Sequence, residues 1–365
     1  MARLRVGILG ASGLVSQRMQ QRLSNHPWFE LAAVAGQSPG MKLSEIQWHL
    51  DEQRPHSVRQ SDIQILDINK NDLSSEFLKR GVEIVFSALP FQPALNLERR
   101  LVDEGIHVFS NASAYRMDPK VALVVADVNP EALHPPQPGR ALHACATNCT
   151  LIPVLHPLSV LVQHHDVVKV VVRSEQALSG AGWKLLHDAE LRKEYVGQEI
   201  EGEAEKIVEE AEKILSLSGV EWDVQCKRID EKDGHVVDLE VHLSNRPSFE
   251  EIQLVLKSGS ESPHVSLPSQ PLQSMEIVDT EPTRDRFLWN GKTSETAEPS
   301  MDLKSGMTTT VQLLDVQGGV VTIRALSHNT VRGAAGGVVL LAELAHYNDY
   351  LASVDINASS YSSDT

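Results

Sequence analysis

Three glycines near the start of the chain constrain its fold more than any other feature. Gly7, Gly10 and Gly13 lie within or directly after an apolar run at 4–9, and a helical pattern follows them. A strand, a glycine turn and a helix in this order begin a doubly wound α/β sheet, and the turn exposes backbone N–H groups that can bind a phosphate. A tight turn without a ligand would leave the same pattern. We favour a dinucleotide site made by Gly10, Ala11, Ser12, Gly13, Leu14 and Val15.

Strand and helix patterns alternate through the first half of the chain. We expect strands at 29–36, 62–68, 82–89 and 106–111. The helices between them are expected to end before Pro27, at Gly81 and at Gly105. Such alternation is typical of βαβ units and a parallel sheet. The sequence therefore predicts an α/β Rossmann-type domain, which we place at residues 1–148.

The pattern changes after about residue 165. Strand patterns then follow one another without a helix between each pair, at 167–175, 236–244, 251–258, 308–316 and 320–327. One long helix is expected at 203–217. We expect a second, α+β domain with a mixed sheet at 149–328.

Three further segments complete the predicted organisation. The polar stretch 283–306 is expected to be a long loop, and the helix at 329–352 to complete the Rossmann domain. The Ser-rich end of the chain, 353–365, is expected to be disordered.

The charge and cysteine content narrow the possible partners. The chain has 33 Lys and Arg against 49 Asp and Glu, a formal charge of −16, so it has no general attraction for nucleic acid or anionic membranes. No apolar run approaches the ~20 residues of a membrane span. Three cysteines make no disulfide framework, which favours the cytoplasm or an equivalent reducing compartment. We expect a small-molecule substrate, no nucleic acid and no membrane.

The end of the second strand indicates the type of dinucleotide. An acidic residue there would bind a ribose 2′-hydroxyl and repel a 2′-phosphate. This chain instead continues with Gln37, Ser38 and, slightly later, Lys42. We therefore expect NADP rather than NAD.

Cys149, in the stretch Ala-Thr-Asn-Cys-Thr, admits several readings. A metal site with His143 and Cys145 lacks a fourth ligand, and we expect no metal. A buried core thiol and a nucleophile at the start of a helical segment both remain open. His235, at a turn before a strand, is the candidate base, and the local pattern alone does not choose between the two readings.

Eight segments, taken together and in order, resemble one family. They are 6–18, 85–90, 110–119, 146–150, 176–182, 202–207, 228–235 and 326–337. The chain resembles the aspartate-semialdehyde dehydrogenases, in particular their archaeal and fungal-like branch. The resemblance implies NADPH-dependent reduction of L-aspartyl-4-phosphate to L-aspartate 4-semialdehyde, on the route to lysine, threonine and methionine.

The same resemblance implies roles for individual residues. Cys149 would attack the acyl phosphate to form a thioacyl enzyme, His235 would be the acid/base, and Gln176 would position the substrate. Substrate-binding residues would be Arg228 for the carboxylate, Glu203 for the ammonium group, Lys206, Arg116 and Asn148 for the phosphate, and also Ser179 and Gly180. Cofactor contacts would add Ser87, Ala88, Leu89, Asn111, Gly180 and Asn329.

The resemblance also implies a homodimer or homotetramer formed through the second domain. The regions 236–257 and 307–326, read as strands without obvious helical cover, fit a buried interface on the sheet.

Several positions depart from the family pattern. Ser16 stands where a glycine is usual, no arginine lies near Gln37, Val236 and Val237 follow the histidine, and 288–305 looks like an insertion. Because the same scaffold and thiol serve acyl-CoA reductases, a reductase of this kind, such as malonyl-CoA reductase, is the alternative enzyme. A non-catalytic dinucleotide sensor is the alternative of another class.

Overall fold

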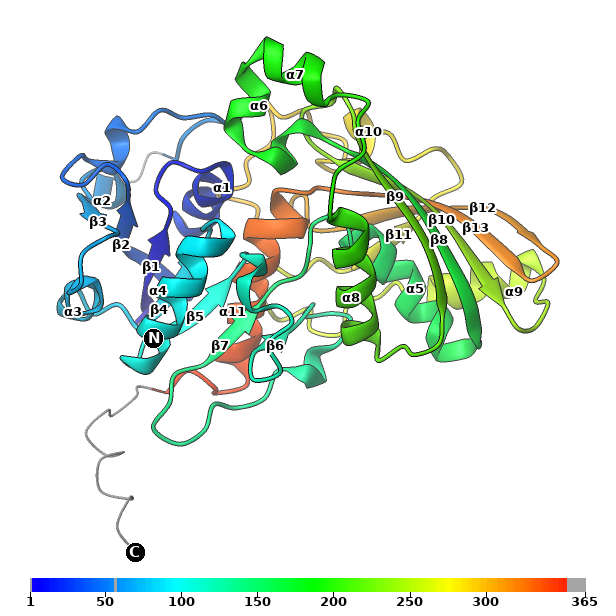
Figure 1. Ribbon diagram of the computed structural model, residues 1–365, viewed down its shortest axis with the longest axis horizontal. Helices are drawn as coiled ribbons and strands as arrows, with labels where there is room; N and C mark the ends of the chain where they lie inside the picture. Colours follow the sequence, from blue (N-terminus) through cyan, green and yellow to red (C-terminus); the bar gives the residue numbers. More distant parts are fainter. Residues whose placement is uncertain (1, 56–57, 353–365) are drawn as a thin grey trace, which may run out of the picture.

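The computed structural model describes residues 2–55 and 58–352, and its first half is built on a seven-stranded parallel sheet (Figure 1). The strands run in the order β3-β2-β1-β4-β5-β7-β6. Their bounds are β1 (Leu4–Leu9), β2 (Phe29–Gly36), β3 (Ile65–Asp67), β4 (Ile84–Ser87), β5 (His107–Ser110), β6 (Ala122–Leu123) and β7 (His143–Cys145). The order places β1 and its glycine turn at the centre of the sheet, where doubly wound folds bind dinucleotides.

Helices from both ends of the chain cover this sheet. They are α1 (Leu14–Leu23), α2 (Val58–Ser61), α3 (Leu73–Lys79), α4 (Phe91–Asp103) and α11 (Gly336–Tyr347). α11, the red helix of Figure 1, contacts α1 and β5. Its Val338, Leu341 and Leu344 are fully buried in the same core as Val6 and Ile8 of β1. The end of the chain thus packs against its beginning.

The second half is built on a six-stranded mixed sheet in the order β11-β12-β13-β10-β8-β9. The strands are β8 (Val167–Gln176), β9 (Glu221–Arg228), β10 (His235–Leu243), β11 (Met275–Ile277), β12 (Thr309–Gln317) and β13 (Val320–Ser327). Pairing is antiparallel in the middle and parallel at both edges. A parallel sheet followed by a mixed sheet confirms the predicted fold class.

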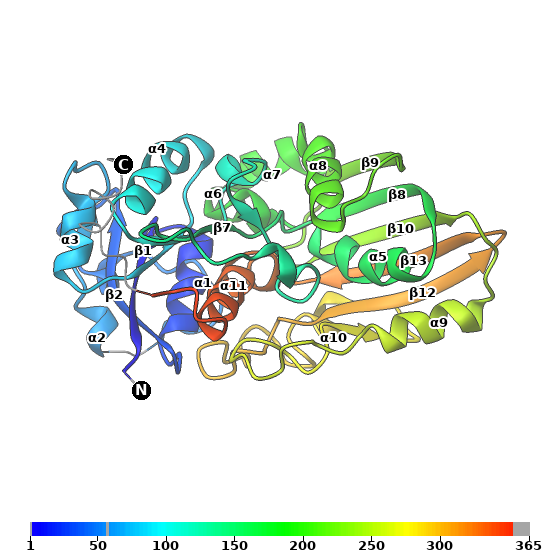
Figure 2. The ribbon, with the colours of Figure 1, turned by 90° about the horizontal axis from the view of Figure 1, so that it is seen from below.

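The helices of the second half leave one face of its sheet open. α5 (Ile152–His164) and α9 (Phe249–Ser258) lie along one side of the sheet, and α8 (Glu203–Leu215) lies beside β9 (Figure 2). Val237, Leu239 and Val241 of β10 are buried toward this side. The alternate residues Asp238 and Glu240 of β10 point to the other face. α6 (Trp183–His187), α7 (Ala189–Tyr195) and α10 (Arg284–Phe287) are short.

One predicted element of the second half was wrong, and one strand was missed. The stretch 251–258 is not a strand but the helix α9, because Ser248 and Glu251 form a capping box and Ile252 and Leu256 bury one helical face. β9 was not predicted at all. Its exposed positions are charged or polar, with Glu221, Gln225 and Lys227 open to solvent, so no apolar run marks it.

Other predicted boundaries shifted less. The first helix ends at Leu23 rather than just before Pro27. The stretch 283–306 contains the short α10 and turns that bury Trp289, so it is less irregular than expected. The predicted disordered tail, 353–365, lies outside the described residues. Among the residues that are described, no helix is long and apolar enough to cross a membrane.

Candidate active site

Cys149 lies in a turn between β7 and α5, and the helix begins three residues later, at Ile152. The expected position at the helix N-terminus is therefore slightly wrong. His235 is the first residue of β10 and is fully buried. Its Nε2 lies 3.4 Å from Sγ of Cys149. The backbone N–H of Ala177 donates to Nδ1 of the same ring at 3.0 Å. Thiol and imidazole, separated by 86 residues in sequence, are thus in contact.

The surroundings of Cys149 favour the thiol over the thiolate when no ligand is present. Burial, followed by the charge of Glu203, raises its pKa to about 11, although Arg116 and Arg228 oppose the shift. Burial and the nearby carboxylate therefore outweigh the two arginines.

Glu203, at the start of α8, contacts several polar groups close to Cys149. Its Oε1 accepts hydrogen bonds from Asn148 Nδ2 at 2.9 Å and from Gln176 Nε2 at 3.3 Å. Thr150 Oγ1 lies 3.4 Å away, and Lys206 Nζ is 3.8 Å from the other carboxylate oxygen. Lys206 is exposed. A carboxylate, two amides and an exposed cation therefore lie together near Cys149.

Arg228, the last residue of β9, also lies close to Cys149 and His235. Its Nη1 donates to the carbonyl of Ala177 at 2.7 Å, and burial lowers the pKa of its guanidinium. A Cβ added to Gly180 would lie 3.1 Å from Arg228 Nη1 and 3.2 Å from His235 Nε2. Gly180 therefore leaves the space in which arginine and histidine can meet one ligand.

Glu210 also lies in the candidate site, although it was not among the expected residues, because Glu and Lys side chains at helical spacing on 203–213 are typical of a solvated helix face. It is only 2% exposed. Its carboxylate accepts from Thr147 Oγ1 at 2.7 Å, from the backbone N–H of Asn148 at 2.8 Å and from Arg116 Nη1 at 2.9 Å. Glu210 thus holds the turn before Cys149 and pairs with Arg116, which was expected to be free for phosphate.

Gly333 is a second missed residue. It lies in a π-helical turn, Val331–Ala335, that leads into α11. A Cβ added there would stand 2.7 Å from the Cβ of Cys149 and 2.9 Å from its Cα. Only a glycine allows this approach, so the turn packs directly against the backbone and Cβ of Cys149. The "RGAAGG" glycines in the sequence were a signal for it, although their partner could not be known.

The glycine turn after β1 has the geometry of a phosphate cradle. Gly10 has φ +100°, and a Cβ there would lie 3.2 Å from the carbonyl of Ala88. Gly13 precedes α1, and a Cβ there would meet no atom within 4 Å. Close packing at one glycine and open space at the other fit a turn that receives a ligand.

Unpartnered polar atoms lie beside this turn. Ser87 Oγ, at the end of β4, and both side-chain polar atoms of Asn111 are buried without a hydrogen-bond partner among the described residues. Ser16 Oγ, on α1, is in the same state. Native proteins rarely leave such groups unpaired, so these residues fit a polar ligand such as a dinucleotide.

Other predicted cofactor residues are tied to protein groups. Lys42 is exposed and its Nζ lies 2.8 Å from Asp62, while Gln37 is exposed and Ser38 half-buried. Asn329 accepts from the backbone N–H of Gly234 and donates to Ser179 Oγ, both at 2.8 Å. Asn329 and Ser179 therefore join the expected cofactor site to the turn that carries His235.

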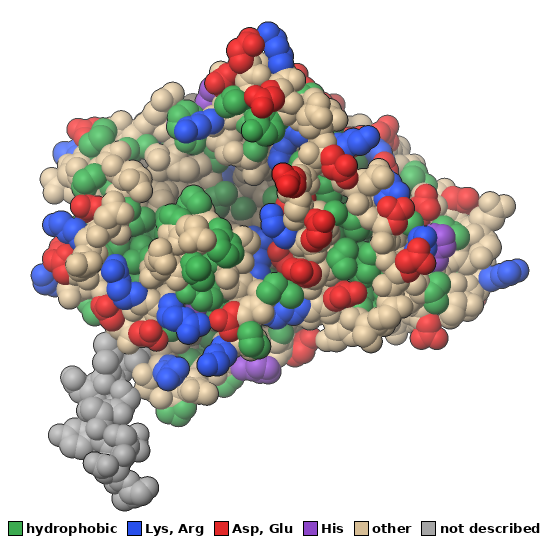
Figure 3. Space-filling model, viewed as in Figure 1, with side chains coloured by type: hydrophobic (Ala, Val, Ile, Leu, Met, Phe, Trp, Pro, Cys, Tyr) green, Lys and Arg blue, Asp and Glu red, His purple; other side chains and the backbone are tan. Residues whose placement is uncertain are grey.

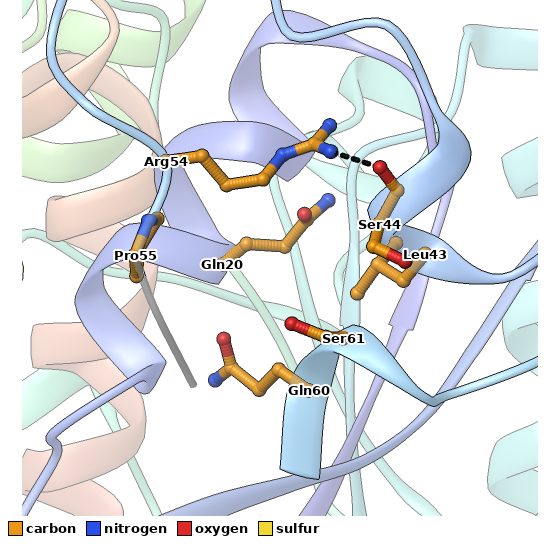
Figure 4. A pocket seen from close by; sticks show the side chains of 7 residues that line it. All are labelled: Gln20, Leu43, Ser44, Arg54, Pro55, Gln60 and Ser61. Carbon is orange, nitrogen blue, oxygen red and sulfur yellow. Dashed lines mark hydrogen bonds between the residues drawn. The ribbon is translucent and has the colours of Figure 1, made fainter. Parts of the chain in front are cut away.

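Neither of two cavities in the structure contains Cys149. The first, about 20 Å³, has room for about one water molecule and is lined by Gln20 of α1 and Arg54 (Figure 4). The second, about 340 Å³, lies beside α10 and is lined by Arg284, Arg324 and three carboxylates. Figure 3 shows instead that the surface is hollowed between the two halves of the molecule. No group of three or more His, Cys, Asp or Glu side chains within 2–55 and 58–352 could hold a metal ion.

Comparisons with known proteins agree with this arrangement. Residues 5–135 match the family model "Semialdehyde dehydrogenase, NAD binding domain". The chain is 32% identical to the aspartate-semialdehyde dehydrogenase of Aspergillus fumigatus, over 94% of this chain and 98% of that protein. It is 26% identical to the malonyl CoA reductase (NADP) of Metallosphaera sedula, over 95% of this chain and 98% of that protein.

A solved structure of the same family has a similar fold. The crystal structure of aspartate-semialdehyde dehydrogenase with NADP from Candida albicans has a TM-score of 0.76 and 25% identity, covering 96% of this chain and 100% of the other. Both the similarity in sequence and the similarity in fold extend over nearly the whole chain. The chain belongs to the aspartate-semialdehyde dehydrogenase family.

Proposed function

We propose that this protein reduces L-aspartyl-4-phosphate to L-aspartate 4-semialdehyde with NADPH, releasing inorganic phosphate, in the biosynthesis of lysine, threonine and methionine. The observation that carries the proposal is the pairing of Cys149 with His235 at 3.4 Å in a family of this activity. A sensor that only bound dinucleotide would need neither the contact nor the polar groups around it.

The residues around Cys149 match the charges of the substrate. Arg228 can bind the α-carboxylate, and Glu203 the α-ammonium group, because each carries the opposite charge. Lys206, close to Glu203 and exposed, can reach the phosphate. Gln176 and Asn148, both bonded or adjacent to this cluster, orient the acyl group.

The reaction begins when Sγ of Cys149 attacks the acyl carbon, so that a thioester forms and phosphate leaves. NADPH, when bound, supplies the hydride that reduces this thioester. The cofactor would be held by the glycine turn Gly10–Val15, by Ser87 and by Asn111. Its nicotinamide ring would lie near Asn329 and Gly180. Nε2 of His235 faces the sulfur and can donate a hydrogen bond to the oxygen of the acyl group as it gains charge.

The test is an assay in the reverse direction. Aspartate semialdehyde, phosphate and NADP⁺ should give NADPH absorbance, and omission of phosphate should abolish it. Cys149→Ser should lose this turnover but keep NADP binding. Malonyl-CoA reduction without the phosphate-dependent reaction would instead support the acyl-CoA reductase alternative, which the pairing of Arg116 with Glu210 leaves possible.

We also propose that the protein is a homodimer or homotetramer in a reducing compartment such as the cytoplasm. The open face of the six-stranded sheet, which carries Arg173, Asp238 and Arg324, offers a surface for a second copy. All three cysteines are free, and the reaction needs a reduced Cys149. Sedimentation velocity of the purified protein would reveal a monomer if the assembly is wrong.

A further inference from the structure

We propose that Asp127 is a positioning residue for Cys149. It acts through Arg332 on the turn that packs against Cys149, and through His156 on the helix that follows Cys149 in sequence. The inference rests on the proposed function only for its effect on turnover, because the reactivity of the thiol can be measured without substrate.

Asp127 lies where several parts of the fold meet. It belongs to the loop after β6, and its side chain is fully buried. Its Oδ1 pairs with Nη2 of Arg332 and lies 3.4 Å from Nε2 of His156. Its Oδ2 accepts a hydrogen bond from Nε2 of Gln270 at 3.2 Å. One carboxylate thus joins groups from widely separated segments of the chain.

Arg332 connects this carboxylate to the nucleophile. It belongs to the π-helical turn Val331–Ala335, is only 1% exposed, and its Nε has no hydrogen-bond partner among the described residues. A Cβ added to the next residue, Gly333, would lie 2.7 Å from Cβ of Cys149. Because a planar peptide unit joins Arg332 to Gly333, the ion pair that holds Arg332 also limits where Gly333 can lie against Cys149.

His156 provides the second connection. It lies on α5, whose first residue, Ile152, comes three residues after Cys149. Its Nδ1 lies 2.7 Å from Oγ1 of Thr309, the first residue of β12, and its Nε2 lies 3.2 Å from Nη2 of Arg332. The imidazole therefore links α5 to the turn and to the six-stranded sheet. A change at Asp127 acts on both elements that adjoin Cys149.

The ion pair of Asp127 with Arg332 is charged although it is buried. Burial alone would raise the pKa of Asp127, but Arg332 and then His156 hold that pKa well below its usual range. Removing one partner of such a pair leaves the other charge uncompensated, whereas replacing both by uncharged groups is often tolerated. This difference separates a role in position from a role in stability.

The first test compares a single with a double substitution. Asp127→Asn leaves Arg332 unpaired, so the urea midpoint should fall by about 1 M and kcat at least about tenfold. Asp127→Asn/Arg332→Met removes both charges, so its urea midpoint should return to within about 0.3 M of wild type, while kcat stays at least about tenfold low. The KM for aspartate semialdehyde should change less than about threefold in both, because Arg228 and Glu203 are untouched.

Glu343 provides a matched control for these variants. It is a fully buried carboxylate on α11, and its hydrogen-bond partners are His26 and the N–H of Ser269 rather than the turn or α5. Glu343→Gln should also lower the urea midpoint, because the amide cannot accept from both partners. Its kcat should stay within about twofold of wild type. Recovery of kcat together with stability in the double variant would show that Asp127 acts on stability alone, and would overturn the proposal.

The second test needs no substrate and no folded single variant. Iodoacetamide alkylates Cys149 at pH 8, and Cys149→Ser measures the background from the two buried cysteines. A displaced turn would relieve the burial that raises the pKa of Cys149, so the rate should rise at least about fivefold in the double variant. Glu343→Gln should stay within about twofold of wild type.

The two tests distinguish failure of this proposal from failure of the proposed reaction. An alkylation rate in the double variant equal to that of wild type would show that Asp127 does not position Cys149. A wild-type protein without phosphate-dependent turnover, but with the expected rise in alkylation, would contradict the proposed reaction and support the role of Asp127.

Discussion

At the scale of single residues, Glu210 holds more of the candidate site than its sequence pattern suggested. Its carboxylate serves the turn before Cys149 and the guanidinium of Arg116, with side chains only 3% and 10% exposed. Removing one partner of a buried ion pair leaves the other charge uncompensated. We expect Glu210→Gln to lower the free energy of unfolding by about 3 kcal/mol in urea denaturation.

The neighbouring Glu209 provides a matched control for this measurement. It lies on the same helix but is exposed. Glu209→Gln should change the free energy of unfolding by less than about 0.5 kcal/mol. Equal effects of the two substitutions would show that Glu210 has no special role.

Gly333 gives a prediction for activity rather than stability. A methyl group there would stand 2.7 Å from Cβ of Cys149, so either the turn or the nucleophile must move. Misplacement of a reacting group by about 1 Å can cost about 100-fold in rate. We expect Gly333→Ala to lower kcat at least about tenfold, because the displaced sulfur no longer meets the acyl carbon.

Two further measurements separate this effect from general damage. NADP binding, followed by fluorescence titration, should stay near the wild-type value, since the turn at Gly10–Val15 is made by other elements. An unchanged kcat would mean that the structure tolerates the methyl group and that Gly333 does not position Cys149.

At the scale of elements, α9 depends on its first residues. Ser248 Oγ accepts from the backbone N–H of Glu251 at 3.2 Å, and the Glu251 side chain accepts from the N–H of Ser248 at 2.6 Å. Loss of such an N-cap costs about 1 kcal/mol, which we expect for Ser248→Ala in urea denaturation. Ser258→Ala, at the other end of the helix, should cost less than about 0.5 kcal/mol, and a larger cost there than at Ser248 would contradict the capping argument.

The same helix shows why some elements escaped prediction from the sequence. Ile252, Leu254, Val255 and Leu256 form a short apolar run that suits a strand or a helix equally well. The capping box upstream was the deciding signal. β9 was not predicted because it lacks such an apolar run. It is an edge strand with charged residues facing solvent. The glycine turn and the alternating strands and helices of the first half were predictable, because each of these elements is marked by residues within its own short segment.

Some residues of the candidate site could be predicted from the sequence, and others could not. Motifs in the sequence identified five residues that the structure brings together, namely Cys149, His235, Gln176, Glu203 and Arg228. Glu210 and Gly333 act on Cys149 or its turn from far along the chain, with 62 residues between Glu210 and Asn148. Nothing in a single sequence gives such contacts, because they depend on how α8 and the turn before α11 pack in three dimensions.

At the scale of the whole molecule, a buried arginine joins the two halves. Arg18, on α1, donates to Glu52 at 2.5 Å and to Thr330 at 3.2 Å, and lies 3.4 Å from Asp233. Asp233 precedes the catalytic candidate His235 by two residues. One side chain therefore links α1, which follows the glycine turn, to the turn that precedes His235. We infer that the two sites keep a fixed position relative to each other.

Buried histidines contribute to the pH dependence of the stability of the folded protein. Burial lowers the pKa of five of them in the folded state, namely His49, His107, His156, His235 and His328. The unfolded chain binds protons at these positions near pH 6.5, whereas the folded protein does not. The stability that these five histidines contribute is therefore fully present above about pH 6.5 and is lost as the pH falls below it.

His328 tests this dependence, because burial lowers its pKa to about 3. Between about pH 6 and pH 4 it should remove about 1.4 kcal/mol of stability per pH unit. His328→Phe keeps a ring against Trp289, whose centroid lies 4.4 Å away, but cannot bind a proton. Urea denaturation at several pH values should show a slope that is smaller by this amount, while His134→Gln, at an exposed position, should leave the slope unchanged. Parallel curves for wild type and His328→Phe would mean that His328 is protonated in the folded protein, and the burial argument would then fail for this residue.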